Sequence, residues 1–205
     1  CIFNLETSYN AATDKKKAFL QVFWDEFNGK RGLNKFNLTL AQLLEKPLME
    51  RGLLEQFKEV IADMGGDWNN PSEAADLVDQ ALEMVVDTAC ELNPQFDRNS
   101  LYNHIDKRDY AISIERFGME LADYIKDKGE DYRLILLADE VSQFINKERD
   151  RYLNLQEIIT KLSEACNNQV WVACTAQQDL SEIMDDCNIG EEKDKEGKIK
   201  GRFEV

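Results

Sequence analysis

The chain has 205 residues, of which 43% are apolar and 32% are charged, and its net charge is −15. This length suits one core, or at most one and a half domains, and so acidic a surface argues against non-specific binding of nucleic acid by the chain itself. No apolar run approaches the ~20 residues of a membrane span and no signal peptide is present, so we expect a cytoplasmic protein with no membrane partner.

The N-terminal sequence indicates a fragment of a longer protein, because it lacks an initial Met and begins directly with strand-like residues at 2–5. A helix is predicted over residues 14–28, where four large apolar side chains share one face. One or two helices are predicted over residues 39–63, with an interruption at Pro47, because proline lacks the N–H that a helix interior needs.

A clear helix start lies at Asn70, which is the expected N-cap. Pro71 falls at the first helical position and Glu73 at the third, a spacing that satisfies the free N–H groups of the first turn. We expect this helix to continue to about Leu92. Two further helices are predicted, over residues 100–107 and 110–128.

Two apolar runs later in the chain predict strands. Residues 134–138 and 170–174 show no polar alternation, which is typical of strands buried on both faces in a parallel sheet. A helix is predicted between them over residues 151–166, so the order is strand, helix, strand, a βαβ unit. A short helix is predicted over residues 178–186, and a charged loop over 190–201.

The cysteines do not indicate a metal or nucleophile site. The five are widely spaced, and His104 is the only histidine. We therefore expect reduced thiols of a cytosolic protein, without a zinc site or a cysteine–histidine nucleophile.

The strongest chemical signal is Asp139-Glu140, which follows the first apolar run directly. Parallel sheets place ligands at the carboxyl ends of their strands. There, Asp139 could hold a hydrated Mg²⁺ and Glu140 could deprotonate the water that attacks a γ-phosphate. This is the Walker B pattern of hydrolysing ATPases, although an ordinary strand-end turn can read the same way.

The end of the second apolar run reads Cys174-Thr175-Ala176-Gln177-Gln178-Asp179. In a βαβ unit this end lies beside Asp139, where a hydroxyl or amide can bond the attacking water or the γ-phosphate, the role called sensor 1. The alternative is that Thr175 or Gln178 only caps the next helix.

Arg202 is a candidate arginine finger, a group that stabilises transition-state charge on a phosphate. A lone surface arginine is the commoner interpretation of such a residue. No phosphate-cradling G-x-x-x-x-G-K-[ST] motif occurs in the chain, so we expect that loop to lie upstream of Cys1.

The segment from Arg133 to Ile145, RLILLADEVSQFI, resembles the DEVGQ(Y/F)I Walker B segment of the BrxC/PglY family, the P-loop proteins of BREX phage-defence systems. Residues 153–159, 170–172 and 175–179 are also similar to that family, and IKGRF at 199–203 resembles its IQGRF. The resemblance covers about residues 113–205. Ser142 and Ala138 depart from the family pattern, where glycine and valine are expected, and neither is expected to touch the chemistry.

The resemblance implies a very large bacterial ATPase that uses ATP and Mg²⁺ and acts with other BREX components, including a methyltransferase and a PglZ-type protein. It implies Asp139 as the Mg²⁺ residue, Glu140 as the catalytic base, Thr175 or Gln177 as the sensor, and Arg202 as a finger or second sensor. Contacts to DNA through other parts of the parent, and a homo-oligomer, are compatible with it. The isolated fragment, lacking the phosphate loop, is expected to be inactive.

The expected fold is α/β: a partial P-loop NTPase of the AAA+/ASCE kind, with a parallel sheet, helices on both faces and a large, mainly helical insertion. Residues 1–28 would begin the core with the strand and helix after the missing Walker A motif. Residues 29–110 would be the insertion, since roughly 130 residues before the Walker B strand exceed one crossover. Residues 111–205 would carry Walker B and sensor 1.

Two other functions remain open at this point. One is a different AAA+ or STAND ATPase, as in replication initiation or signalling. The other is a degenerate P-loop fold that binds partner proteins and hydrolyses nothing. An intact phosphate loop upstream would favour an ATPase. The sequence does not show what such an ATPase acts on.

Overall fold

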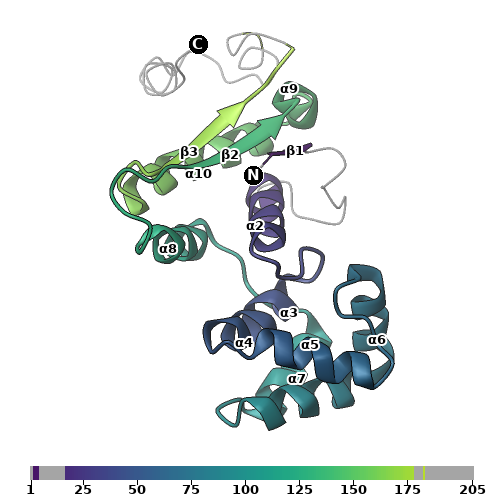
Figure 1. Cartoon of the computed structure of the whole chain (residues 1–205). Helices are drawn as coiled ribbons and strands as arrows, with labels where there is room; N and C mark the ends of the chain where they lie inside the picture. The colour runs from purple at the N-terminus through teal and green to yellow at the C-terminus, as the bar shows by residue number, and fades with distance from the viewer. Residues whose placement is uncertain (1, 5–16, 178–181, 183–205) are drawn as a thin grey trace. The chain divides into compact units, whose positions relative to one another are not determined.

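A computed structural model describes residues 2–4, 17–177 and 182 of the chain (Figure 1). The fold is mixed α/β and mostly helical. It divides into two compact units, residues 25–111 and residues 1–24 with 112–205, which we call the helical unit and the sheet unit. Within the described residues, no helix has both the length and the apolar character needed to pass through a lipid bilayer.

The two units contain different kinds of elements. The sheet unit has β1 (Ile2–Asn4), the start of α2 (Ala18–Lys30), α8 (Ile114–Ile125), β2 (Leu134–Asp139), α9 (Val141–Ile145), α10 (Arg149–Ala165) and β3 (Val170–Cys174). The helical unit has the end of α2, α3 (Leu38–Leu40), a π-helical segment (Ala41–Glu45), α4 (Lys46–Glu50), α5 (Leu54–Asp63), α6 (Pro71–Leu92) and α7 (Arg98–Lys107).

The sheet has three parallel strands in the order β1-β2-β3, so β2 is central among them. Leu134 lies opposite Val170 in the β2–β3 pair, and Ile2 lies opposite Leu137 in the β1–β2 pair. The chain runs from β2 through α9 and α10 to β3, which confirms the predicted parallel strand–helix–strand order. This arrangement places the carboxyl ends of β2 and β3 at the same edge.

The prediction that both strands are buried on both faces is wrong for the described part of the chain. Burial alternates along β2, and Ile135 is 49% exposed. Its neighbour on β3, Trp171, is 58% exposed. Helices therefore cover one face, where α10 packs against β3, and the expected second helical layer is not among the described residues. An apolar run shows which residues can be buried, but not which layers are present to bury them.

The start of α2 packs against the helices of the sheet unit. The buried Asn154 side chain on α10 accepts a hydrogen bond from the Phe19 N–H at 3.1 Å, so it satisfies a free donor of the first turn of α2. Phe19 also meets Phe144 of α9 edge-on, with ring centroids 4.8 Å apart. These contacts fix α9, which follows β2 directly.

α8 is shorter than the predicted helix over residues 110–128. It begins after Ser113, whose hydroxyl accepts a hydrogen bond from the Arg116 N–H at 3.2 Å. Gly118 allows α8 to approach α10 closely, because a Cβ at this position would lie 3.0 Å from the Cβ of Ala165. The close packing of α8 against α10 therefore depends on the absence of a side chain there.

The core of the helical unit contains a buried carboxylate. Glu45 is only 3% exposed, and its Oε1 accepts a hydrogen bond from the Trp68 indole at 2.7 Å. Its Oε2 accepts one from the Asn34 N–H. Burial raises the pKa of Glu45, although these hydrogen bonds act in the opposite direction. The apolar part of this core includes Leu40, Leu44, Leu48, Phe57, Ile61, Val85 and Val86.

The predicted interruption at Pro47 is wrong. The chain stays helical from Leu38 to Glu50, and the break comes at residues 51–53. Pro47 follows the π-helical segment and sits in the first turn of α4. Because the chain is already helical before Pro47, the missing N–H removes one hydrogen bond from the helix next to the π-helical segment, but it does not end the helix.

The start of α6 is confirmed. The Asn70 side chain accepts a hydrogen bond from the Ser72 N–H at 3.1 Å, and Asn70 Nδ2 donates to Glu73 Oε1 at 3.0 Å. The helix ends at Leu92, as expected. A break within it was not predicted: Ala81 has non-helical torsions, φ −141° and ψ 39°.

Candidate functional site

The carboxyl ends of β2 and β3 bring together four of the predicted site residues: Asp139, Glu140, Thr175 and Gln177. Asp139 is the last residue of the central strand and lies opposite Asn4 of β1. It is exposed, on the same side of the strand as Ile135. The carboxylate therefore lies at the open face of the sheet, where a ligand can reach it.

Glu140 has a left-handed backbone conformation, with φ 56° and ψ 41°. Side chains other than glycine, asparagine and aspartate rarely adopt it, and it costs about 1–2 kcal/mol. This conformation turns the chain from β2 into α9 without an intervening loop. Neither the turn nor α9 was predicted, because a strand followed by acidic residues carries no signal for a positive φ.

Thr175 connects the two acidic residues. Its hydroxyl donates a hydrogen bond to Asp139 Oδ1 and accepts one from the Glu140 N–H at 3.0 Å. The backbone of Thr175 continues the pairing, since its N–H donates to the Ala138 carbonyl at 3.0 Å and its carbonyl accepts from Val141 at 2.9 Å. The side chain of Thr175 therefore sets the direction of the Asp139 carboxylate.

Two glutamine amides contact the Glu140 carboxylate. Nε2 of Gln177 and Nε2 of Gln143 each lie 3.4 Å from Glu140 Oε1. These distances are at the long end for a hydrogen bond, so both contacts are weak. Gln143 was missed from the sequence, although its place three residues after Glu140 on a helix would bring the two side chains together.

Ser142 contacts the backbone beside the site, and the expectation that it does not touch the chemistry stays a prediction. Ser142 is only 6% exposed, and its hydroxyl accepts a hydrogen bond from the Gln177 N–H at 3.2 Å. The segment that follows β3 is thus tied to the first turn of α9 at Gln177. The departure from glycine at this position was the available signal, since serine adds a hydrogen-bonding group that glycine lacks.

The oxygen donors at this edge suit Mg²⁺ better than a soft metal. Asp139 offers a carboxylate and Thr175 a hydroxyl, and Mg²⁺ typically uses one or two carboxylates together with water and substrate phosphates. Among the described residues, no group of three or more His, Cys, Asp and Glu side chains could enclose a metal ion. The described residues at this edge therefore offer two oxygen donors of the kind that Mg²⁺ uses, and no enclosed metal site of their own.

The cysteine nearest the site is not poised to react. Burial raises the pKa of Cys174 to about 12 and that of Cys166 to about 11, so both thiols are protonated near neutral pH. Cys90, Cys166 and Cys174 are free thiols. Glu140 is therefore a better candidate base at this edge than any thiol nucleophile.

The remaining candidate residues, Gln178 and Arg202, lie outside the described part of the chain, as does nearly all of the helix predicted over residues 178–186. The proposed finger and the alternative of a helix cap at Thr175 or Gln178 thus stay predictions. Comparison with known proteins adds no assignment: no protein-family model matches the chain, and no solved structure matches it.

Proposed function

We propose that this sheet edge is the Mg²⁺-binding and water-activating half of an ATP-hydrolysing site in a longer P-loop protein of the AAA+/ASCE kind. Asp139 holds the metal, Glu140 is the base, and Thr175 and Gln177 sense the γ-phosphate. The proposal requires a phosphate-binding loop supplied by sequence outside this chain. The exposed face of the sheet beside Asp139 leaves room for further parts of the protein, including this loop.

The observation that carries this proposal is the Thr175 hydroxyl between Asp139 and the Glu140 backbone. It orients one carboxylate and places the next residue in a left-handed turn of φ 56°. Unfavourable backbone conformations cluster at functional sites, where the surrounding structure compensates for them. Asp139 and Glu140 are held by different neighbours, so one carboxylate can bind a metal ion while the other accepts a proton.

In the proposed reaction, Glu140 takes a proton from water while the water oxygen forms a bond to the γ-phosphorus. The bond from phosphorus to the β,γ-bridging oxygen breaks, and ADP leaves with that electron pair, giving ADP and phosphate. A Mg²⁺ ion at Asp139 would neutralise charge on the phosphate oxygens. Gln143 and Gln177 hold Glu140 weakly enough to release it to water.

The resemblance to the BrxC/PglY family supports a place for this ATPase in a cytoplasmic BREX anti-phage complex. In that setting the partners are a methyltransferase and a PglZ-type protein. Arg202 acts as the finger, in its own site or that of a neighbouring copy. Any DNA contact is made by other parts of the parent, because the chain described here carries a net charge of −15.

The direct test measures ATP hydrolysis by the full-length parent and its Glu140→Gln variant. Loss of a general base is expected to lower the rate by about 10²–10⁴-fold while Mg·ATP binding is retained. Glu157→Gln, which changes an exposed carboxylate on α10, is the matched control and is expected to hydrolyse ATP normally. A Glu140→Gln protein as active as the parent would overturn the assignment.

Thr175 provides a second test of the same site. Thr175→Val removes the hydroxyl but keeps the shape, so we expect a rate at least about tenfold lower, corresponding to one lost hydrogen bond to a charged group. Thr175→Ser keeps the hydroxyl and is expected to restore most of the rate. Equal rates for the valine and serine variants would show that the hydroxyl does not position Asp139.

A second candidate is a degenerate P-loop fold that only binds partner proteins. It is favoured by one fact: Asp139 and Glu140 already have hydrogen-bond partners within the fold, as a structural connection between strand ends requires. If the parent and its Glu140→Gln variant both fail to hydrolyse ATP while the defence complex is active, this function replaces the first. The isolated chain is expected to bind Mg·ATP poorly in either case, and micromolar binding by it would contradict the need for an external loop.

A further inference from the structure

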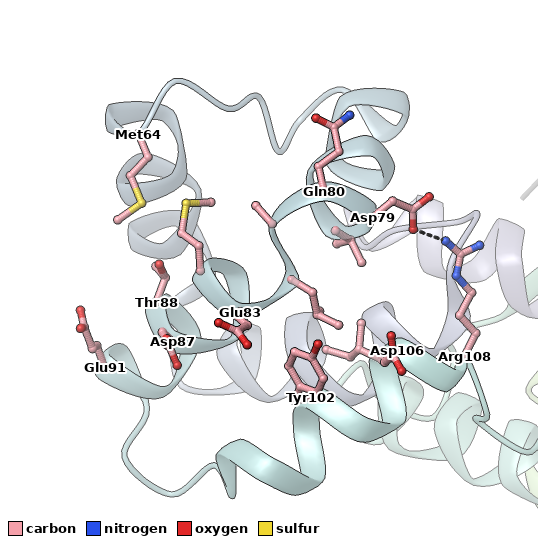
Figure 2. A pocket seen from close by; sticks show the side chains of 15 residues that line it. Met64, Asp79, Gln80, Glu83, Asp87, Thr88, Glu91, Tyr102, Asp106 and Arg108 are labelled. Carbon is pink, nitrogen blue, oxygen red and sulfur yellow. Dashed lines mark hydrogen bonds and ion pairs between the residues drawn. The ribbon is translucent and has the colours of Figure 1, made fainter.

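The helical unit has a hollow of about 780 Å³ between the end of α5, the two halves of α6, and α7 (Figure 2). We call this hollow the acidic groove. The side chains used below are Met64, Glu83, Met84, Glu91, Tyr102 and Asp106, all of which line it. The groove lies entirely within residues 25–111, so it is independent of the sheet-edge site.

The break in α6 shapes the acidic groove. At Ala81 the torsions leave the helical region, and Gln80 before the break and Glu83 after it lie on different segments of the wall (Figure 2). Kinks are usually caused by proline or glycine, and neither occurs in residues 78–84. The packing of the unit therefore maintains the opening.

Apolar side chains are accessible in the acidic groove. Met64 at the end of α5 is 53% exposed, and Met84 and Tyr102 are half-buried. Methionine adapts its shape to different apolar surfaces, and tyrosine is enriched among the residues that contribute most to protein interfaces. These three side chains could contact the apolar face of a ligand.

The charge of the acidic groove is strongly negative. Five carboxylates and one guanidinium line it, and that guanidinium, on Arg108, already pairs with Asp79. Asp87 pairs with Arg98. Glu91 and Asp106 form no ion pair with any described residue, and Glu83 interacts only with Arg98, which is already paired with Asp87. A positively charged ligand would therefore be attracted electrostatically to this surface, and nucleic acid would be repelled.

We propose that the acidic groove binds a basic amphipathic helix from a partner protein. Residues 25–111 are all described and contain no strand, so the unit offers no sheet edge for an extended peptide. Helical walls with accessible apolar side chains match helix-in-groove recognition. A second copy of this chain is disfavoured as the occupant, because its own net charge is −15.

The binding test uses the 205-residue chain and a fluorescein-labelled synthetic peptide of about 18 residues, five helical turns, with Leu on one face and Lys on the other. Two control peptides keep the length: a scrambled one of the same composition, and one with Glu in place of Lys. Fluorescence anisotropy is expected to show binding of the amphipathic basic peptide at least about tenfold tighter than of either control.

Matched variants locate the site. Glu91→Lys with Asp106→Lys reverses two groove carboxylates, and Glu59→Lys with Asp76→Lys reverses two exposed carboxylates of the same unit outside the groove. The first pair is expected to weaken peptide binding about tenfold or more, and the second about twofold or less. Circular dichroism and thermal unfolding verify that each variant folds.

Methyl resonances provide a readout that does not depend on charge changes. With ¹³C-methyl methionine, the Met64 and Met84 signals are expected to shift on peptide addition. The Met119 signal is expected to stay, because this side chain is 66% exposed in the sheet unit. Equal weakening by both variant pairs, tight binding of the scrambled peptide, or shifts at Met119 alone would overturn the proposal.

Discussion

Glu45 in the helical unit and Glu140 in the sheet unit are both held by hydrogen-bond donors, but the two environments differ. Glu45 is 3% exposed, and an indole and a backbone N–H donate to its two oxygens. Glu140 is half-exposed, and two side-chain amides share one of its oxygens at 3.4 Å.

This contrast separates a structural carboxylate from an available one. The donors around Glu45 occupy both oxygens in a closed core, so no room is left for a ligand. At Glu140 the strong interaction is made by the backbone, through Thr175, and the carboxylate keeps lone pairs for water. The polar contacts of Glu45 stabilise the fold, whereas the backbone conformation of Glu140 costs stability and its carboxylate makes only weak contacts.

The largest expected effect on stability comes from Glu45→Ala. The change leaves the Trp68 indole and the Asn34 N–H buried without an acceptor, and each such group costs about 1–3 kcal/mol. Hydrogen–deuterium exchange is expected to show the loss across residues 25–111. Glu140→Ala, the matched change in the other unit, is expected to alter stability by less than about 1 kcal/mol. Similar losses for the two variants would remove the distinction between these glutamates.

The second effect concerns the sheet unit alone. Gly118→Val adds two methyl groups to a Cβ that would itself lie only 3.0 Å from the Cβ of Ala165, and overpacking of this kind costs about 1–3 kcal/mol. Hydrogen–deuterium exchange is expected to become faster in α8 and α10, while the amides of α5 and α6 stay as protected as in the unchanged protein. Met119→Val puts the same side chain at the adjacent exposed position as a control. An equally large loss there would mean that helix propensity, rather than the close approach, explains the result.

The third effect is a gain. Glu140→Gly removes the steric penalty of the left-handed conformation, and chemical denaturation is expected to show a stability about 1 kcal/mol higher than that of Glu140→Ala. ATP hydrolysis by the parent is expected to be lost in both variants. If the Glu140→Gly variant is no more stable than the Glu140→Ala variant, the φ of 56° at this position does not destabilise the folded protein.

The smallest effect is a pH dependence from Glu45. Its folded-state pKa is raised above the ordinary 4.5 by burial, so the native state keeps a proton that the unfolded state has lost. The resulting stability is present at low pH and is lost as pH rises through the raised value. As pH rises through the raised pKa of Glu45, amide hydrogen–deuterium exchange in the helical unit is expected to become faster by more than the intrinsic pH dependence of exchange predicts. The Glu45→Gln variant is expected to lose this pH dependence of exchange. If the pH dependence is unchanged in the variant, another titratable group causes it.

Local signals in the sequence predicted several elements well. Asn70, Pro71 and Glu73 marked the start of α6 because cap geometry involves only neighbouring residues. The apolar runs located β2 and β3 to within one residue. The sequence also singled out Asp139 and Thr175, since the order of strands and helix implied that their strand ends meet.

Features that depend on distant contacts were not predicted. The break at Ala81 has no proline or glycine to signal it, and the left-handed Glu140 is unusual for its residue type. The open face at Ile135 and Trp171 could not be inferred, because apolar residues read alike whether or not a layer covers them.

The sequence by itself determined the strand–helix–strand order, the cap of α6 at Asn70 and the two acidic residues at the end of β2, because each depends on local backbone preferences and side-chain periodicity. Only the tertiary structure decided that Thr175 bonds Asp139, that Ser142 ties down Gln177, and that a broken α6 opens the acidic groove. Those features join residues that are far apart in the chain or balance local strain against packing elsewhere, and no local pattern records that balance.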